Sequence, residues 1–271
     1  MHVVVCIKMV PDTTQVSINP ETNTLVREGV PFITNPYDTN AVEEGIRFKD
    51  KYGAYVTVIS MGPPSALVVL RKALAIGADE GILLSDRVFG GADTLATSMV
   101  LSAAINKINL TRTVDIILCG KQTIDGDTAQ VGPGIAQRLN ITQLTLVNEV
   151  LSVDEENKTI RVKRKLEGYQ EIVESILPTM ITVEREINTP RYPTVPGRFN
   201  ADDAVIRIWG NDVLKLNTQE IGLTGSPTQV RRIFAPVREK GEIVIGEGTQ
   251  QSNAVNMVFN KLVEKSFLEL K

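Results

Sequence analysis

The chain has 271 residues, 42% apolar and 23% charged, a composition typical of globular proteins and sufficient for a substantial core. With 29 basic against 32 acidic residues and a net charge of −3, it lacks the basic surface expected of a nucleic-acid-binding protein. The only histidine is His2 and the two cysteines lack metal-ligand spacing, which excludes Ser-His-Asp catalysis, Cys-His catalysis and multi-imidazole sites.

The first residues and the two cysteines indicate the cellular location. The opening run His2–Ile7 lacks the charged start, apolar core and cleavage site of a signal peptide. No stretch reaches the roughly 18 apolar residues of a membrane helix. Cys6 and Cys119 lie inside apolar runs, as buried reduced thiols do. We therefore expect a cytoplasmic protein without membrane insertion, in which any chemistry depends on a bound cofactor.

The first half of the chain alternates apolar runs with amphipathic segments, which predicts a parallel sheet with helical crossovers. The predicted strands are Val3–Ile7, Val56–Met61, Gly81–Ser85 and Asp115–Gly120. The predicted helices are Tyr37–Lys51, Ser65–Ile76, Thr94–Lys107 and Ala129–Leu139. Turn residues within Gln15–Thr34 predict a small hairpin.

Several residues mark the predicted helix ends. Asn35 can cap the first helix, with Pro36 in its first turn, and Asp93 can cap the third. Pro63, Pro64 and Ser65 begin the second helix, and Gly77 can end it in a left-handed conformation.

Beyond residue 140 the pattern changes to the alternation of antiparallel strands, expected at one edge of the parallel core. These strands are Val147–Val153, Thr159–Leu166, Glu171–Ser175 and Met180–Val183, with a turn at Asp154–Asn157. The three prolines of Thr189–Pro196 interrupt regular structure, so we predict an α/β domain over residues 1–196 and a C-terminal arm over residues 197–271.

The arm contains a short predicted strand, Val205–Trp209, a glycine-rich stretch, Gly241–Gly248, and an amphipathic helix, Asn253–Glu269. The helix carries apolar side chains that need a surface to cover, which predicts contact with a partner chain. They are Val255, Val258, Phe259, Leu262, Phe267 and Leu268.

In an open α/β sheet, ligands bind beyond the carboxyl ends of the strands. Four loops leave those ends here: Lys8–Asp12, Gly62-Pro63, Arg87–Asp93 and Gly120–Pro133. The fourth runs from a buried strand into a helix whose first amides can bind phosphate, and its glycines allow close backbone approach. A nucleotide loop and a plain polar loop with helix caps both fit this pattern.

Two common nucleotide motifs are missing, because the sequence has neither GxxxxGK[ST] nor GxGxxG. Asp125 and Asp127 lack further ligands, so capping and solvation explain them better than a metal site. In the third loop, Gly90 and Gly91 precede Asp93, Thr94, Thr97 and Ser98, which suits a pyrophosphate, with a capped glycine turn as the alternative.

Several stretches together resemble the beta subunit of electron transfer flavoprotein. The resemblance covers residues 1–200 and continues more weakly beyond. It rests on VVVCIKMVPD, NPYDTNAVEEGIRFKD, KALAIGADEGILL, GKQTIDGDTAQVGP, KRKLEGYQEIVESILPTMITV and TPRYPTVP. It implies an adenine-nucleotide alpha-hydrolase-like fold, an open, mainly parallel sheet with helices on both faces, antiparallel edge strands and a C-terminal extension that wraps an alpha subunit.

The resemblance also implies the bound nucleotide, which is a structural AMP in ordinary members and FAD in the electron-bifurcating group. The run SDRVFGGADTLATS, Asp38 and Gly126 resemble the bifurcating group. The implied nucleotide contacts are Cys6, Ile7, Lys8, Asn35, Pro36, Asp38, Met61, Gly62, Arg87, Gly90, Gly91, Asp93, Thr94, Thr97, Gln122, Thr123, Asp125, Gly126, Asp127, Thr128, Gln130, Val131 and Gly132. Arg87 either favours a negative flavin species or a nucleotide phosphate, or it forms only a surface ion pair.

For the bifurcating group, the family implies that NADH delivers a hydride to the beta-subunit FAD. One electron then passes to ferredoxin or flavodoxin, and the other passes through the alpha-subunit FAD to a flavin dehydrogenase of the acyl-CoA or lactate type. Arg191, Val195 and Pro196 lie in the implied partner-recognition loop, where Val195 replaces the family's leucine. Two alternatives stay open: a non-bifurcating carrier with AMP, and a nucleotide-sensing module without a redox role.

Overall fold

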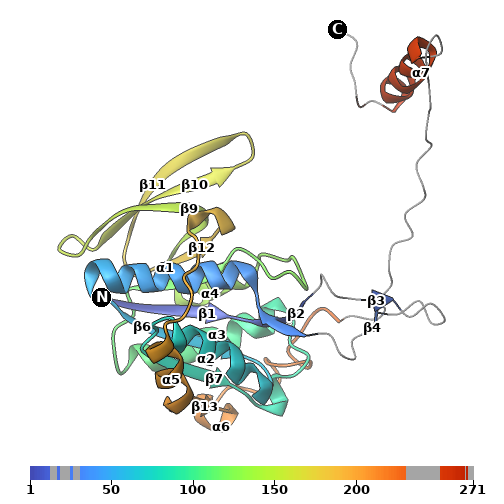
Figure 1. Ribbon diagram of the computed structural model, residues 1–271. Helices are drawn as coiled ribbons and strands as arrows, with labels where there is room; N and C mark the ends of the chain where they lie inside the picture. The colour runs from blue at the N-terminus through green and yellow to red at the C-terminus, as the bar shows by residue number, and fades with distance from the viewer. Residues whose placement is uncertain (13–16, 19–24, 27–30, 230–250, 266, 268–271) are drawn as a thin grey trace. The chain divides into compact units, whose positions relative to one another are not determined.

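The computed structural model describes residues 1–12, 17–18, 25–26, 31–229, 251–265 and 267. The chain forms two compact units, Met1–Ile233 and Phe234–Lys271. The first unit is built on a nine-stranded sheet with the order β11-β10-β9-β12-β8-β1-β6-β7-β13 (Figure 1). This mainly parallel sheet, with helices on both faces, confirms the predicted fold class.

The strands from β9 across to β13 run parallel, and β10 and β11 extend the sheet as an antiparallel edge. The strand bounds are β1 His2–Ile7, β6 Tyr55–Met61, β7 Glu80–Leu84, β8 Ile116–Gly120, β9 Thr142–Asp154, β10 Thr159–Leu166, β11 Tyr169–Ile176, β12 Thr179–Val183 and β13 Arg207–Trp209. Two short antiparallel pairs stand outside this sheet, β2 Met9–Pro11 with β5 Phe32–Thr34 and β3 Ser17–Ile18 with β4 Leu25–Val26.

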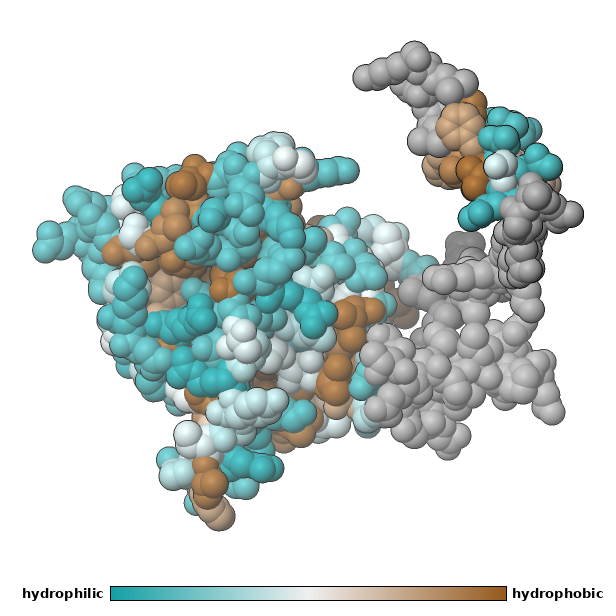
Figure 2. Space-filling model, turned by 45° about the horizontal axis from the view of Figure 1, so that its top comes forward, coloured by the Kyte–Doolittle hydropathy of each residue, from teal (hydrophilic) through white to brown (hydrophobic). Residues whose placement is uncertain are grey.

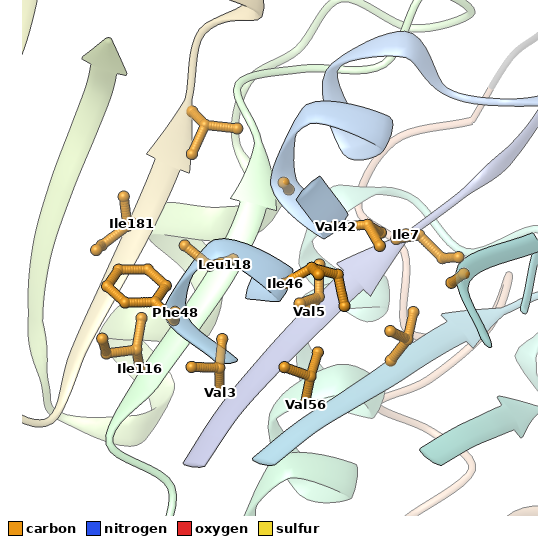
Figure 3. Close-up of a cluster of buried hydrophobic side chains, with 14 of the residues drawn as sticks. Val3, Val5, Ile7, Val42, Ile46, Phe48, Val56, Ile116, Leu118 and Ile181 are labelled. Carbon is orange, nitrogen blue, oxygen red and sulfur yellow. The ribbon is translucent and has the colours of Figure 1, made fainter. Parts of the chain in front are cut away.

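Helices cover both faces of the sheet, because its central strands are apolar on both sides. Alternate residues of β1 enter opposite cores: Val3 and Val5 pack with α1 and α2, and Val4 packs with α3 and α4. Figure 3 shows the first core, where Val42 and Ile46 of α1 lie among the side chains of the strands. The helix bounds are α1 Pro36–Tyr52, η2 Pro64–Ala66, α2 Leu67–Ala75, η3 Arg87–Phe89, α3 Thr94–Asn109, α4 Val131–Leu139, η4 Arg185–Ile187, α5 Val195–Asp203, α6 Asn211–Leu214 and α7 Gln251–Glu264.

The prediction that Met180–Val183 is an antiparallel edge strand is wrong. β12 lies between β8 and β9 and pairs in parallel with both, and all five of its residues are buried. A strand buried on both faces has no polar side, so its short apolar run belongs to the centre of the sheet. The other three predicted strands pair antiparallel with one another as β9, β10 and β11, and β9 also pairs in parallel with β12.

The chain stays on the first unit beyond Pro196. Helix α5 packs on α2, and β13 pairs with β7 as the last strand of the sheet. The predicted C-terminal helix is present as α7 in the second unit, with Val255, Val258 and Phe259 exposed. The predicted stretch Gly241–Gly248, Leu268 and the turn residues Asn19, Pro20 and Asn23 lie outside the described residues.

Candidate functional site

The parallel strands bring four loops to one edge of the sheet. Strands β1, β6, β7 and β8 are adjacent and point the same way, so their carboxyl ends lie side by side (Figure 1). The side chains of Cys6 and Ile7, at the end of β1, are buried in opposite cores. Only the main chain of these two residues can therefore face a ligand at this edge.

The carboxylate of Asp38, in the first turn of α1, joins the first and fourth loops. Its Oδ2 accepts a hydrogen bond from Lys8 N at 2.8 Å, and its Oδ1 accepts one from Gly120 N at 3.2 Å. A Cβ atom on Gly120 would lie 2.4 Å from that Oδ1 and 2.6 Å from Tyr37 Cβ. Glycine at position 120 thus allows the end of β8 to approach α1 this closely.

Burial raises the pKa of Asp38 to about 7, against hydrogen bonds from Asn35, Lys8 and Gly120 that lower it. The side chain is only 5% exposed, so desolvation of the charged form outweighs its donors. A perturbed carboxyl among loops that leave the strand ends is typical of a functional site.

Asn35 holds the fourth loop and does not cap α1, which corrects the sequence-based prediction. Its Nδ2 donates to Gln122 O at 2.9 Å, and its Oδ1 accepts from Ile124 N at 3.2 Å. No hydrogen bond from the Asn35 side chain caps the helix, which starts with Pro36 in its first turn. The side chain is fully buried, so these bonds fix the loop relative to the start of α1.

An ion pair lies on the outside of the same junction. Lys8 Nζ is 2.6 Å from Asp125 Oδ2. Burial alone would raise the pKa of Asp125, but the hydrogen bond from Lys8, with further bonds, holds it below its usual value. Both side chains are partly exposed, so the pair adds little to stability.

The fourth loop is also bonded within itself. Gln122 Nε2 donates to Asp127 Oδ1 at 2.8 Å, and Asp127 N donates to Thr123 O at 2.9 Å. Asp127 and Ala129 have φ angles of 49° and 54°, which L residues rarely adopt. Backbone strain of this kind concentrates at ligand sites. It also explains why α4 begins at Val131 and not at the predicted Ala129.

The third and fourth loops are directly connected. Thr94 Oγ1 donates to Gln130 Oε1 at 2.8 Å, so the starts of α3 and α4 are joined at this edge. Gly132 lies in the first turn of α4, where a Cβ atom would be 2.7 Å from Thr182 Cγ2. It therefore serves the packing of α4 on β12.

In the third loop, Asp93 caps α3 as predicted: its Oδ1 accepts from Leu95 N and Ala96 N, both at 3.0 Å. Gly91 has a φ of 71°, which favours glycine. Thr97 is half-buried on α3, and the exposed side chain of Arg87 has no hydrogen bond or ion pair with any described residue.

Sequence reasoning missed residues 221–228, which lie on this loop. Leu223 N donates to Gly90 O at 3.0 Å, and Thr228 bonds to Asp93. The only local signal was the turn-forming run Gly225-Ser226-Pro227-Thr228 in a tail expected to form an arm.

The remaining predicted contacts lie in the second and fourth loops. Met61 ends β6, and Gly62 N donates to Leu84 O at 3.0 Å, which joins the second loop to the end of β7. Gly126 and Thr128 are exposed in the fourth loop. Among the described residues, no group of three or more His, Cys, Asp or Glu side chains could hold a metal ion.

The predicted recognition loop is fixed at one end to α1. Arg191 Nε is 3.0 Å from the buried Glu43 carboxylate, and Arg191 Nη2 is 2.8 Å from Asp50; these contacts raise the pKa of the guanidinium. Tyr192 and Val195 are 92% and 69% exposed. The face of the first unit seen in Figure 2 is largely hydrophilic with smaller hydrophobic patches. Side chains as exposed as Tyr192 and Val195 are candidates for partner contact.

Comparisons with known proteins show which family the whole chain resembles. Residues 22–212 match the family model of the electron transfer flavoprotein domain. Protein FixA of Azotobacter vinelandii is 47% identical, over 97% of this chain and 94% of its own length. The electron transfer flavoprotein subunit beta of Clostridium acetobutylicum and the caffeyl-CoA reductase-Etf complex subunit CarD of Acetobacterium woodii are each 45% identical, over 99% of this chain and 100% of their own lengths. In the described part of the chain, no helix is long and apolar enough to span a membrane.

Proposed function

The chain belongs to the electron transfer flavoprotein family as one of its beta subunits, and from this premise we propose that it holds an FAD in an electron-bifurcating complex. The names of two relatives favour this branch over an ordinary carrier. One is a subunit of a caffeyl-CoA reductase-Etf complex and the other is a FixA protein.

The residues at the strand ends fit such a nucleotide. The backbone of the fourth loop, strained at Asp127 and Ala129, leads into the first amides of α4, which have no partner within the helix. Helix amides of this kind bind phosphate oxygens. The fourth loop is held in place by Lys8, Asn35 and Asp38. The adenosine end of the site is completed by the main chain of Cys6 and Ile7.

The observation that carries FAD over AMP is the hydrogen bond between Thr94 and Gln130. It joins the third loop, with Gly90 and Gly91, to the fourth. A ligand seated on the fourth loop can therefore extend onto the Gly90-Gly91 turn and the hydroxyl-bearing first turn of α3. AMP has only one phosphate and no ribityl chain, so it would leave the third loop without a ligand group to hold.

When bound, FAD supplies the redox chemistry, which is acceptance of a hydride from NADH and delivery of single electrons to ferredoxin or flavodoxin and to the FAD of the alpha subunit. The chain's own residues bind and orient the cofactor. The exposed cation of Arg87 lies in the third loop, where it would favour a phosphate or a negatively charged flavin. We place the complex in the cytoplasm, in agreement with the two buried free thiols.

The proposal includes two protein partners. The exposed apolar face of α7, with Val255, Val258 and Phe259, would contact the alpha subunit. The segment that runs from Arg191 into the first turn of α5, with Val195 and Pro196, would contact a flavin dehydrogenase of the acyl-CoA or lactate type. The Arg191 contacts hold the start of this segment while Val195 stays exposed.

A charge at position 195 tests the second contact. Val195→Asp should lower the affinity for the dehydrogenase by at least tenfold, because an unpaired carboxylate would be desolvated in an apolar contact. Titration of the partner into the complex measures this, with Val205→Asp as the control because Val205 is also exposed. Unchanged electron transfer from the variant to the dehydrogenase would refute the role of Val195.

The function itself is tested by adding NADH to the purified complex without any dehydrogenase. We expect loss of the oxidised-flavin absorbance within the mixing time of a rapid-kinetics experiment. A complex whose flavin is reduced only by a dehydrogenase is the AMP-containing carrier, and a preparation without flavin absorbance is a nucleotide sensor. Either result contradicts the proposal.

A further inference from the structure

Residues 221–228 pack directly on the third loop. Ile221 is buried in the same core as Phe89, at the start of that loop. Leu223 N donates to Gly90 O at 3.0 Å, and a Cβ atom on Gly222 would lie only 2.0 Å from Val88 O. The backbones of the two segments are therefore in contact.

The carboxylate of Asp93 is shared between these segments. Its Oδ1 accepts both amides of the α3 cap, and its Oδ2 accepts from Thr228 N at 3.1 Å and from Thr228 Oγ1 at 2.9 Å. Asp93 N in turn donates to Ser226 Oγ at 2.8 Å. Partial burial opposes ionisation of Asp93, but the donors on Ala96, Thr228 and Leu95 lower its pKa, so the carboxylate accepts charge-assisted hydrogen bonds.

The hydrogen bonds continue from Asp93 toward the fourth loop. Its neighbour Thr94 donates to Gln130, one residue before α4. A path of contacts therefore runs from Thr228 through the start of α3 to the start of α4. Without residues 221–228, the Gly90-Gly91 turn would keep the conformational freedom of two glycines, and a ligand would have to order it on binding.

We infer that Ser226 and Thr228 are positioning residues that hold the third loop ready for the diphosphate and flavin end of a dinucleotide cofactor. They contact Asp93 and act through it on the Gly90-Gly91 turn and the first turn of α3. This inference rests on the proposed function, because only a ligand longer than a nucleoside monophosphate uses the third loop. It makes these two residues a source of discrimination between FAD and AMP.

Thr228→Val removes the hydroxyl and keeps the shape of the side chain. In the full chain, purified with its partner subunit and depleted of nucleotide, this variant should bind FAD about tenfold more weakly, the loss expected for one charge-assisted hydrogen bond. AMP binding should be unchanged. Amide hydrogen exchange should rise at residues 88–97, and Thr228→Ser, which retains the hydroxyl, should restore both properties.

Thr218→Val is the matched control, since Thr218 is exposed and its side chain has no hydrogen bond with any described residue. The inference is overturned if Thr228→Val loses FAD and AMP affinity equally. It is also overturned if the variant keeps both its FAD affinity and its hydrogen exchange unchanged. If the unmodified protein binds AMP and not FAD, the proposed function fails. Hydrogen exchange at residues 88–97 then decides separately whether Thr228 positions the loop, and unchanged exchange refutes it.

Discussion

Two parts of the strand-end edge are built in opposite ways. The junction of the first and fourth loops depends on buried polar side chains, Asn35 and Asp38, that bond to main-chain groups of the sheet and its loops. The third loop has exposed glycines and is held by Asp93 and residues 221–228. Changes at the junction should therefore affect folding, whereas changes around the third loop should affect ligand affinity.

The largest expected effect on stability is that of Gly120→Ala. The new methyl group would overlap Asp38 Oδ1 and Tyr37 Cβ, so β8 and α1 must separate. We expect a loss of about 3 kcal/mol in the free energy of unfolding, measured by chemical denaturation. Gly126→Ala is the control, because its nearest new neighbour, Thr123 Oγ1, would be at an ordinary 3.7 Å, and its effect should stay within about 1 kcal/mol. Equal losses of stability in the two variants would contradict the close packing of Gly120 against α1.

The second effect is a pH dependence of stability due to Asp38. Its pKa is raised from 3.8 to about 7 on folding, so between these values the folded state binds more protons than the unfolded state. The contribution of Asp38 to stability is present below about pH 4 and is lost as the pH rises through about 7. Unfolding free energies of the wild-type protein and Asp38→Asn, measured from pH 4 to 8, should show this fall only in the wild type. Parallel profiles would contradict the buried-junction account.

The smallest effect is expected at Lys8, on the exposed side of the junction. Lys8→Met removes the ion pair with Asp125, which is worth at most about 0.5 kcal/mol at this exposure and less at high salt. Denaturation at low and high ionic strength measures it. A loss comparable to that of Gly120→Ala would mean that the surface pair, and not the buried carboxylate, holds the loops together.

Local patterns predicted much of the fold, and long-range contacts account for the rest. Strand and helix periodicity located the parallel core, the helices and the cap at Asp93, because these depend on nearby residues. The direction of β12 depends on its neighbours β8 and β9, which its own residues do not specify.

The dependence on residues distant in the sequence also explains the wrong predictions at the site. Asn35 has the sequence signature of a helix cap, yet its side chain bonds to Gln122 and Ile124, far along the chain. Thr228 and Asp93 are 135 positions apart, so no local pattern could have joined residues 221–228 to the third loop. The four loops were predicted from the parallel direction of the strands alone, because the carboxyl ends of parallel strands lie at one edge of a sheet.

The cofactor content of the purified heterodimer decides whether this subunit holds FAD. Nucleotides released by denaturation can be separated and counted against protein concentration. We expect two FAD and no AMP per heterodimer, with one of the two FAD molecules lost first when a Thr228→Val variant is diluted. One FAD and one AMP per heterodimer would contradict the proposed function.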